Sequence, residues 1–559
     1  MFIPTTKKEA ALLGWDELDV ILVTGDSYID SPYIGVSVIG KVLMDAGYRV
    51  GMIAQPDTES DRDCSRLGEP ALFWGITAGC MDSMIANYTA TRKKRKKDDL
   101  TAGGKNIRRP DRATIVYGNL IRRYFKDTRP IIIGGIEASL RRISHYDYWS
   151  DKIRRSILFD SRADLLVYGM AERAIVQVAT QLKRKESVKD IKGICYIAKE
   201  KREGYLELSP HDEVAGDKKK FRQMFYSFYN NNDPVTATGL CQRQDTRFLI
   251  HNPPQPPLSP QELDRVYEMD FERALHPGHL EQGPVRAIDT IRFSITTHRG
   301  CYGECNYCSI TAHQGRTVTS RSEASIVREA EGMTRHPDFK GIISDIGGPT
   351  ANMYGIECAL KAKKGGCIDK RCLIPSACEH LPVNHLRQRR LLKKIREIHG
   401  VKKAFIGSGI RHDLILQDKK HGRLYLEDII RHHISGQLKI APEHSQDHIL
   451  ELMGKPASDL TKRFVSLFRD TTERLGMERY LTCYLIAAYP GCTLKDMYRL
   501  KDFTKKVLKF RPRQVQIFTP TPSTMATMIY FTETALSGKS PIFVEKDIRK
   551  KEKQKEALF

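Results

Sequence analysis

The chain has 559 residues, of which 40% are hydrophobic and 28% charged, a balance typical of a soluble globular protein rather than a disordered or fibrous one. No apolar run approaches the ~20 residues needed to cross a bilayer, which excludes an integral membrane protein, and the N-terminal MFIPTTKKEA lacks the apolar core of a secretory signal, so we expect a cytoplasmic location. Lys and Arg number 91 against 68 Asp and Glu, and the net charge of +23 favours anionic partners such as nucleic acid or nucleotides.

The first 200 residues alternate short apolar runs with helical stretches. Residues 19–25 (DVILVTG) have the composition of a buried strand, and a helix of small residues is expected at 35–46. Strands separated by helices in this way predict an α/β domain, 1–200, with a doubly wound parallel sheet that binds ligands near the carboxyl ends of its strands. Further strands are expected at 48–54, 72–79, 129–135, 163–170 and 193–198.

Residues 201–284 are predicted to form a connector, charged at first and proline-rich near 251–260. A second alternating series follows in residues 285–530, with basic amphipathic helices between its strands. This series predicts a partial (β/α)6 barrel of the TIM type, whose active face lies at the carboxyl ends of the strands. Residues 531–559 are expected to be a charged tail. The barrel strands are expected at 291–297, 341–347, 403–409, 437–443, 480–491 and 514–520.

Three cysteines stand on the loop that leaves the first strand of this second series. The stretch SITTHRGCYGECNYCSI (294–310) contains Cys301, Cys305 and Cys308. Thiolates held this close can ligate three corners of an iron–sulfur cube and leave one iron open to another ligand. The alternatives are a zinc site completed by His298 or by a remote cysteine, and buried thiols without a metal.

The C-x3-C-x2-C spacing after a first barrel strand resembles the radical S-adenosylmethionine (SAM) superfamily, and the wider sequence resembles the YgiQ family within it. The resemblance covers nearly the whole chain, and such long strings in one order argue against chance. Besides the cysteine triplet, it is carried by SYIDSPYIGVSVIGKVL (27–43), GGIEASLRRISHYDYWSDKIRRSILFDSRADLLVYGMAER (134–173), DIGGPTANMYG (345–355), GSGIRHDL (407–414), LKIAPEHS (438–445) and FTPTPST (518–524).

This resemblance implies a radical SAM enzyme that binds a [4Fe–4S] cluster through Cys301, Cys305 and Cys308, and SAM at the open iron of the cluster. It also implies that one-electron reduction, by a partner such as flavodoxin or ferredoxin, cleaves SAM to methionine and a 5′-deoxyadenosyl radical. That radical abstracts hydrogen from a substrate, which the family does not identify. The tasks of the protein are then to orient SAM, to exclude water and to deliver the electron.

By the same resemblance, Gly347 and Gly348 correspond to a glycine motif whose backbone meets the methionine amino group. Paired glycines also permit close backbone approach, although a plain tight turn gives the same pattern. Ser408 and Arg411 follow the third strand and are expected to reach the ribose or the carboxylate of SAM. Glu443 follows the fourth strand and is expected to face the cavity. Capping of strand ends is the alternative role for these polar residues.

A second cysteine group lies in a predicted insert, 356–385, between the second and third barrel strands. Cys358, Cys367, Cys372 and Cys378 flank a linker rich in lysine and glycine, which predicts an auxiliary iron–sulfur cluster or a structural zinc. The spacings differ from those of a standard zinc ribbon, so the sequence leaves the metal open. Unligated cysteines that pack a loop are the alternative.

Two further segments carry groups suited to nucleic acids. Residues 92–97 are consecutive cations on a predicted long loop, which either bind RNA phosphates or are merely solvated. Residues 139–150 combine arginines with Tyr146, Tyr148 and Trp149, a composition that suits stacking on bases or on a flat cofactor, and equally an interdomain contact.

The first domain resembles the cobalamin-binding domains that precede many radical SAM barrels. Those that ligate cobalt use an Asp-x-His-x-x-Gly loop after the first strand, whereas the loop here, 24–35, has Asp26 and Asp30 but no histidine. Base-off cobalamin binding is therefore not expected. Two alternative functions remain: an RNA (tRNA)-modifying methylthiotransferase or methyltransferase on the same barrel, and a non-enzymatic iron–sulfur or zinc protein for interaction or redox sensing.

Overall fold

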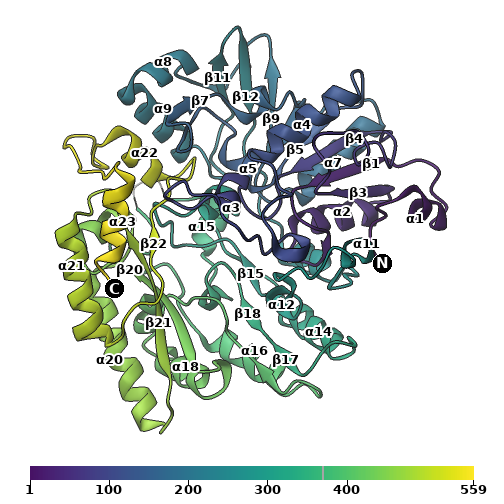
Figure 1. The fold of residues 1–559 in the computed structure, drawn as a ribbon. Helices are drawn as coiled ribbons and strands as arrows, with labels where there is room; N and C mark the ends of the chain where they lie inside the picture. Colours follow the sequence, from purple (N-terminus) through teal and green to yellow (C-terminus); the bar gives the residue numbers. More distant parts are fainter. Residues whose placement is uncertain (368–369) are drawn as a thin grey trace. The chain divides into compact units, whose positions relative to one another are not determined.

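The structure is a computed structural model, and it describes residues 1–367 and 370–559 (Figure 1). The chain folds into two compact units. The first contains Met1–Pro257 and Glu268–Arg292, and the second contains Leu258–Tyr267 and Phe293–Phe559. The segment expected as a separate connector is therefore shared between the two units.

A nine-stranded sheet forms the centre of the first unit. Its parallel part has the order β3-β1-β4-β5-β8, so β1 lies between β3 and β4. This order confirms the predicted doubly wound sheet and places its topological switch point between β1 and β4, where such sheets bind ligands. The strands are β1 (Val20–Thr24), β3 (Val50–Ala54), β4 (Phe73–Thr77), β5 (Ile131–Ile133) and β8 (Leu165–Val167).

The sheet is mixed at one edge, although a wholly parallel sheet was expected from the sequence. β9 (Ile194–Ala198) pairs antiparallel with β8, because residues 184–193 turn the chain back once more after α7 (Glu172–Lys183). Strands from the expected connector then extend this edge, so most of that segment has regular structure. They are β12 (Arg247–His251), β11 (Leu240–Gln244) and β10 (Leu206–Leu208).

Helices cover the central strands of this sheet. Every residue of β1 and β3 is buried, as expected for parallel strands with helices on both faces. α2 (Gly35–Asp45) packs against α7, and α4 (Ala113–Tyr124) packs against β4. The strands β1 and β3 of the sheet are therefore fully buried.

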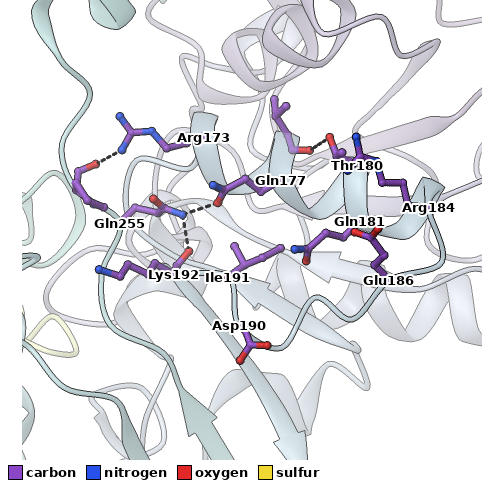
Figure 2. A pocket seen from close by; sticks show the side chains of 12 residues that line it. Arg173, Gln177, Thr180, Gln181, Arg184, Glu186, Asp190, Ile191, Lys192 and Gln255 are labelled. Carbon is purple, nitrogen blue, oxygen red and sulfur yellow. Dashed lines mark hydrogen bonds between the residues drawn. The ribbon is translucent and has the colours of Figure 1, made fainter.

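The proline-rich segment after β12 is bound to α7 (Figure 2). Gln255 Nε2 donates hydrogen bonds to Gln177 Oε1 (2.8 Å) and to the Lys192 carbonyl (2.9 Å). Arg173 Nη1 donates to the Pro256 carbonyl at 3.1 Å. A groove of about 540 Å³ runs beside these contacts, and its lining contains no cysteine or histidine.

The second unit contains parallel strand pairs that follow one another in chain order. β14 (Ser294–Thr296) pairs with β18 (Asp345–Gly347), and β17 (Ile342–Ile343) pairs with β19 (Lys403–Ala404). A bridge between Ile410 and Ile440 leads to β20 (Gln437–Glu443), β21 (Tyr480–Ala487) and β22 (Gln516–Ile517). Every strand predicted in this half is present, and β17 and β18 together form the one expected at 341–347. The closure of these strands as a TIM-type barrel stays a prediction.

Helices separate successive strands of the second unit. α20 (Ser458–Arg474) buries Thr461, Phe464, Val465 and Phe468, which recur at the spacing of one helical face. It lies with α21 (Leu494–Phe503) beside β20 and β21 (Figure 1). The others named below are α14 (Glu323–Thr334), α16 (Leu386–Arg396), α17 (His412–Gln417), α19 (Asp447–Met453) and α22 (Met525–Thr532).

The expected charged tail is helical over α23 (Ile548–Glu556) and packs against the second unit. Gln554 accepts a hydrogen bond from the Ala488 amide (3.0 Å) and donates one to the Cys492 carbonyl (3.1 Å). None of the helices in the described part of the chain is both long and apolar enough to cross a bilayer.

Candidate metal centre

The cysteine loop follows β14 and the short strand β15 (His298–Arg299). Gly300 has a φ of +79°, and a Cβ at this position would lie 1.9 Å from the Thr317 carbonyl oxygen, so the turn requires glycine. Cys301, Cys305 and Cys308 follow it, partly buried and outside any disulfide. The tight turn thus brings all three thiols onto one short loop, as predicted.

Asn306 anchors this loop to two other segments of the second unit. Its amide donates to the Met453 carbonyl and its side chain to the Leu452 carbonyl, both at 2.8 Å. Its own carbonyl accepts a hydrogen bond from the Ala526 amide at 2.8 Å. The end of α19 and the start of α22 therefore fix the loop between Cys305 and Cys308.

Gly303 forms a cradle between two of the sulfurs. Its amide donates to Cys301 Sγ at 3.3 Å. A Cβ at position 303 would lie 3.2 Å from Cys301 Sγ, 3.6 Å from Cys305 Sγ and 2.8 Å from Arg411 Nη1. Both thiols and a guanidinium thus converge on a space that a methyl group at position 303 would partly fill. Burial raises the pKa of the Cys308 thiol to about 12, and a bound metal reverses this effect because it stabilises thiolates.

The choice between an iron–sulfur cube and a single zinc ion depends on how the candidate ligands are grouped. Among the described residues, no three His, Cys, Asp or Glu side chains are grouped to hold one metal ion. Zinc requires every ligand within ~2.0–2.3 Å of one point, whereas each cysteine of an iron–sulfur cube binds a different iron. His298, the expected fourth zinc ligand, is buried with Nδ1 2.8 Å from Thr297 Oγ1, and burial lowers its pKa to about 4. His298 is therefore neutral, with Nε2 unpartnered among the described residues, so it can still act as a zinc ligand, and the iron–sulfur cube stays a prediction.

Arg411 brings a buried positive charge to the cysteine loop from the start of α17. Its Nη1 lies 4.0 Å from Cys305 Sγ, and its Nε and Nη2 donate to Asp413 at 3.0 and 2.6 Å. Burial alone would raise the pKa of Asp413, but Arg411 outweighs it and the pKa falls to about 2. The pair places a compensated cation beside the sulfurs.

Asn352 fixes the backbone of Arg411, and the sequence analysis did not identify it. Its side chain accepts from the Arg411 amide (2.8 Å) and donates to the Arg411 carbonyl (3.0 Å). It also lies 3.2 Å from His385 Nε2, while Asp418 Oδ2 lies 2.9 Å from His385 Nδ1. The string 345–355 contains Asn352, but the partners that give it a role are distant in sequence.

The paired glycines at the end of β18 lie against the segment that precedes the cysteine loop. Gly347 accepts at its carbonyl from the Thr297 amide at 2.7 Å. A Cβ at Gly348 would lie 2.6 Å from His298 Cε1 and 2.8 Å from the His298 carbonyl oxygen. Close packing therefore requires glycine at position 348, and its role toward SAM stays a prediction.

Ser408 forms hydrogen bonds with a carboxylate of the same unit. Its amide donates to Asp345 Oδ1 at 3.0 Å, its hydroxyl donates to Asp345 Oδ2, and the Gly407 amide also donates to Oδ1 at 2.8 Å. Asp345 thus caps the loop after β19. This is the capping role left open by the sequence, and contact of Ser408 with SAM stays a prediction.

Glu443 meets the cysteine loop through Tyr307. The Tyr307 hydroxyl donates to Glu443 Oε1 at 2.8 Å, and Lys455 Nζ lies 3.8 Å from the same oxygen. Glu443 has a φ of +65°, and burial raises the pKa of its carboxyl group. Sequence reasoning missed Tyr307 and Lys455, although the position of Tyr307 between Cys305 and Cys308 was a signal.

The second cysteine group packs next to the cysteine loop. Cys358 Sγ accepts from the Lys361 amide at 3.5 Å, and Cys372 Sγ lies 3.9 Å from Lys361 Nζ. Cys358, Cys372 and Cys378 pack against one apolar cluster together with Cys301, while Cys367 is exposed. A second metal at these residues stays a prediction.

Side chains fill the switch point of the sheet in the first unit. Asp26, two residues after the end of β1, packs closely on Gly79, and a Cβ at position 79 would lie 2.2 Å from Asp26 Oδ1. Its carboxylate accepts from the Cys80 amide (2.7 Å) and from Arg109 Nη2 (2.6 Å), and Arg109 Nη1 lies 2.8 Å from Asp98. Asp26, Asp98 and Arg109 are all buried. Protein atoms therefore occupy the place where ligands of doubly wound sheets bind.

A solved structure shares the fold of the chain. It is TsrM of Kitasatospora setae, a radical S-adenosylmethionine methyltransferase solved with cobalamin and a [4Fe–4S] cluster. The likeness has a TM-score of 0.52 at 14% identity and covers 97% of this chain and 81% of TsrM. At this identity it supports the predicted α/β fold alone.

Sequence comparisons place the chain in a family. Residues 2–294 match the family model described as Radical SAM N-terminal. The UPF0313 protein FN0734 of Fusobacterium nucleatum subsp. nucleatum is 54% identical over 558 residues, covering 100% of this chain and 98% of the relative. A UPF0313 protein of Thermotoga petrophila is 46% identical over 562 residues, with the same coverage of 100% and 98%. The predicted superfamily is thereby confirmed: the chain belongs to the Radical SAM N-terminal family and is a radical SAM enzyme of the UPF0313 type.

Proposed function

We propose that this enzyme holds a [4Fe–4S] cluster at Cys301, Cys305 and Cys308 and cleaves SAM reductively. The observation that carries the proposal is the cradle at Gly303, where two thiols and the Arg411 guanidinium face a space that a single methyl group would fill. When bound, the cluster supplies the electron that splits SAM into methionine and a 5′-deoxyadenosyl radical, which abstracts hydrogen from the substrate. Flavodoxin or ferredoxin is the expected class of electron donor.

The residues around the cradle have separate tasks in this proposal. The Gly303 amide and Arg411 offset the negative charge that thiolates bring into a buried site. Asn306 holds the loop in place, so the site does not need to be ordered when the cofactors bind. Gly348 is expected to leave its backbone open for the amino group of SAM, and Glu443, held by Tyr307, is expected to face the SAM site.

Cobalamin is not part of this proposal. TsrM was solved with cobalamin, but the switch point of the sheet is filled here by Asp26, Arg109 and Asp98. The 24–35 loop also lacks a histidine to ligate cobalt. The RNA-modifying alternative, a methylthiotransferase or methyltransferase, rests on the net charge of +23 and on the basic residues 92–97, and the likeness to TsrM adds support for the fold only. Membership of an enzyme family argues against the non-enzymatic alternative.

Anaerobic reconstitution with iron and sulfide tests the proposal. We expect about four irons per chain at the triplet, and an electron paramagnetic resonance spectrum of the reduced enzyme that changes when SAM is added, because SAM binds the open iron. Iron beyond about four per chain would also place a second cluster at Cys358–Cys378. Zinc in place of iron, or a spectrum that SAM leaves unchanged, would contradict the proposal.

A further inference from the structure

Two segments that the sequence analysis treated separately form one surface of the first unit. Arg92, the first cation of the basic loop, donates from Nη2 to the Tyr148 carbonyl at 2.7 Å, and its guanidinium lies 4.8 Å from the centre of the Tyr148 ring. Tyr88, just before that loop, packs on Trp149 with ring centres 5.5 Å apart. Basic groups and aromatic rings are therefore adjacent on this surface.

The surface is strongly positive. All side chains from Arg92 to Lys97 are exposed, as are Lys105 and Arg108 on the returning part of the loop. Among the described residues, Lys94, Lys96 and Lys97 form no ion pair with a carboxylate. The acids in the loop are already engaged, because Asp98 lies against Arg109 and Asp99 lies 3.9 Å from Arg286.

Hydrogen bonds hold the basic loop in a defined shape. The Arg95 amide donates to the Asn87 carbonyl at 2.7 Å, and the Asn106 side chain donates to the Arg95 carbonyl at 3.0 Å. Lys97 and Lys105 pair as an antiparallel bridge. The backbone that carries these cations is therefore held in place, which lowers the entropy cost of ordering the loop when a polyanion binds.

The aromatic part is anchored in the same way. The Tyr88 hydroxyl donates to Asp111 Oδ2 at 2.7 Å, and the Tyr148 hydroxyl donates to the Ala90 carbonyl at 2.6 Å. Trp149 lies at the edge of this group and is partly exposed, with its ring 5.2 Å from that of Tyr148. A fixed, partly exposed indole beside cations is a suitable platform for a base.

We propose that this surface, defined by residues 88–108 and Trp149, binds single-stranded nucleic acid. The cations from Lys94 to Lys97 contact phosphates, and a base stacks on Trp149. A bilayer surface is the rival polyanion, but it is usually bound with several apolar anchors. Between residues 88 and 108, one large apolar side chain, Ile107, is strongly exposed, which is fewer than the several anchors that a bilayer needs. The proposal concerns binding and does not depend on the proposed SAM cleavage.

Fluorescence anisotropy with the reconstituted full chain tests it. The probe is a fluorescein-labelled single-stranded RNA of about 20 nucleotides, longer than the ~4–16 that such sites cover. The variant is Lys94→Gln/Lys96→Gln/Lys97→Gln, and the matched control is Lys218→Gln/Lys219→Gln/Lys220→Gln, which removes the same charge from exposed positions of α9 (Lys218–Asn230).

We expect the first triple variant to bind at least about tenfold more weakly at moderate salt. The slope of log affinity against log salt should fall by about 2, because each phosphate contact on a single strand contributes ~0.7. The control should bind like the unmodified protein. Equal weakening in both triples, or no weakening in the first, would overturn the proposal.

Trp149 gives a second, independent readout. Stacking should quench its fluorescence when RNA binds, and this part of the quenching should be absent in Trp149→Leu, which should also bind about tenfold more weakly. A DNA strand of the same sequence distinguishes the two kinds of nucleic acid. Equal affinity for DNA and RNA would show that the surface contacts only phosphates and bases. Tighter binding of RNA would show that it also contacts the 2′-hydroxyl groups. Unchanged quenching in Trp149→Leu, or binding to vesicles of phosphatidylcholine and phosphatidylserine without binding to RNA, would contradict the proposal.

Discussion

Arg411 Nη1 lies 4.0 Å from Cys305 Sγ, and the rest of the same guanidinium is paired with Asp413. The contact joins the segment after the third strand to the cysteine loop after the first. Both members of the ion pair are buried, so each compensates a charge that would be costly alone. The cation therefore serves the stability of the unit as well as the charge balance of the thiolates.

Replacing Arg411 by Met should destabilise the protein by about 3 kcal/mol, because Asp413 is left as an unpaired buried carboxylate. The double variant Arg411→Met/Asp413→Leu should recover most of this loss, since no charge then stays buried. Urea unfolding of the two variants measures the difference. Equal stability of the single and double variants would show that the pair is not coupled.

Replacing Gly303 by Ala should reduce iron loading, because the new methyl group meets Arg411 Nη1 and both sulfurs at 2.8–3.6 Å. The control is Gly332→Ala in α14, where the nearest atom is Arg335 Nη2 at 3.9 Å and alanine should stabilise the helix by about 0.5–1 kcal/mol. Iron content after reconstitution measures the effect. Full loading of Gly303→Ala would rule out the cradle as the cluster site.

Hydroxocobalamin should not bind stoichiometrically to the protein, because Asp26 and Arg109 fill the switch point of the sheet. Gel filtration of the reconstituted enzyme with an equimolar amount of the cofactor, followed by absorbance of the protein peak, measures binding. A protein peak that carries one cobalamin per chain would show that the buried pair moves aside or that another site exists.

Stability should fall as the pH is lowered from about 6.5 to 4, partly because of His433. Burial, with a smaller effect of Arg396, lowers the pKa of His433 to about 4, and its Nδ1 donates to the Ala404 carbonyl at 2.7 Å. Between these pH values the unfolded chain binds a proton that the folded chain does not. The stability is therefore greatest above pH 6.5, and up to about 3 kcal/mol from this group is lost by pH 4.

The variant His433→Asn tests this, because asparagine keeps a donor for Ala404 but does not titrate. Its urea midpoint should change less between pH 6.5 and 4 than that of the unmodified protein. His399→Asn, at an exposed position, is the control and should leave the pH dependence unchanged. If His433→Asn and the unmodified protein showed the same dependence of stability on pH, this role of His433 would be contradicted.

Local patterns were sufficient to predict most of the elements and the cysteine loop. β20 occupies 437–443 as expected, and Gly300, with its positive φ, forms the turn before the cysteines. The contacts around the site could not be predicted in the same way. Tyr307 reaches Glu443 across 136 residues, and Ser408 reaches Asp345 across 63, so both depend on how the strands pair.

The mixed edge of the first sheet was missed for a related reason. Alternating strands and helices predict parallel pairing, but the extra reversal at 184–193 places β9 antiparallel to β8. The short strands of 206–251 lie in charged sequence. They join the sheet because β12 pairs with β9, β11 with β12 and β10 with β11, and their composition does not reveal this. Composition alone therefore suggested a connector.

The formation of 5′-deoxyadenosine tests the central claim most directly. The reconstituted enzyme is reduced anaerobically with SAM, and the nucleoside is measured by chromatography. The same assay is run on Cys301→Ala/Cys305→Ala/Cys308→Ala and on the control Cys358→Ala/Cys372→Ala/Cys378→Ala. We predict 5′-deoxyadenosine from the unmodified enzyme and from the control, and none from the first triple variant. Equal amounts from the first triple variant, or none from the unmodified enzyme loaded with iron, would contradict the account.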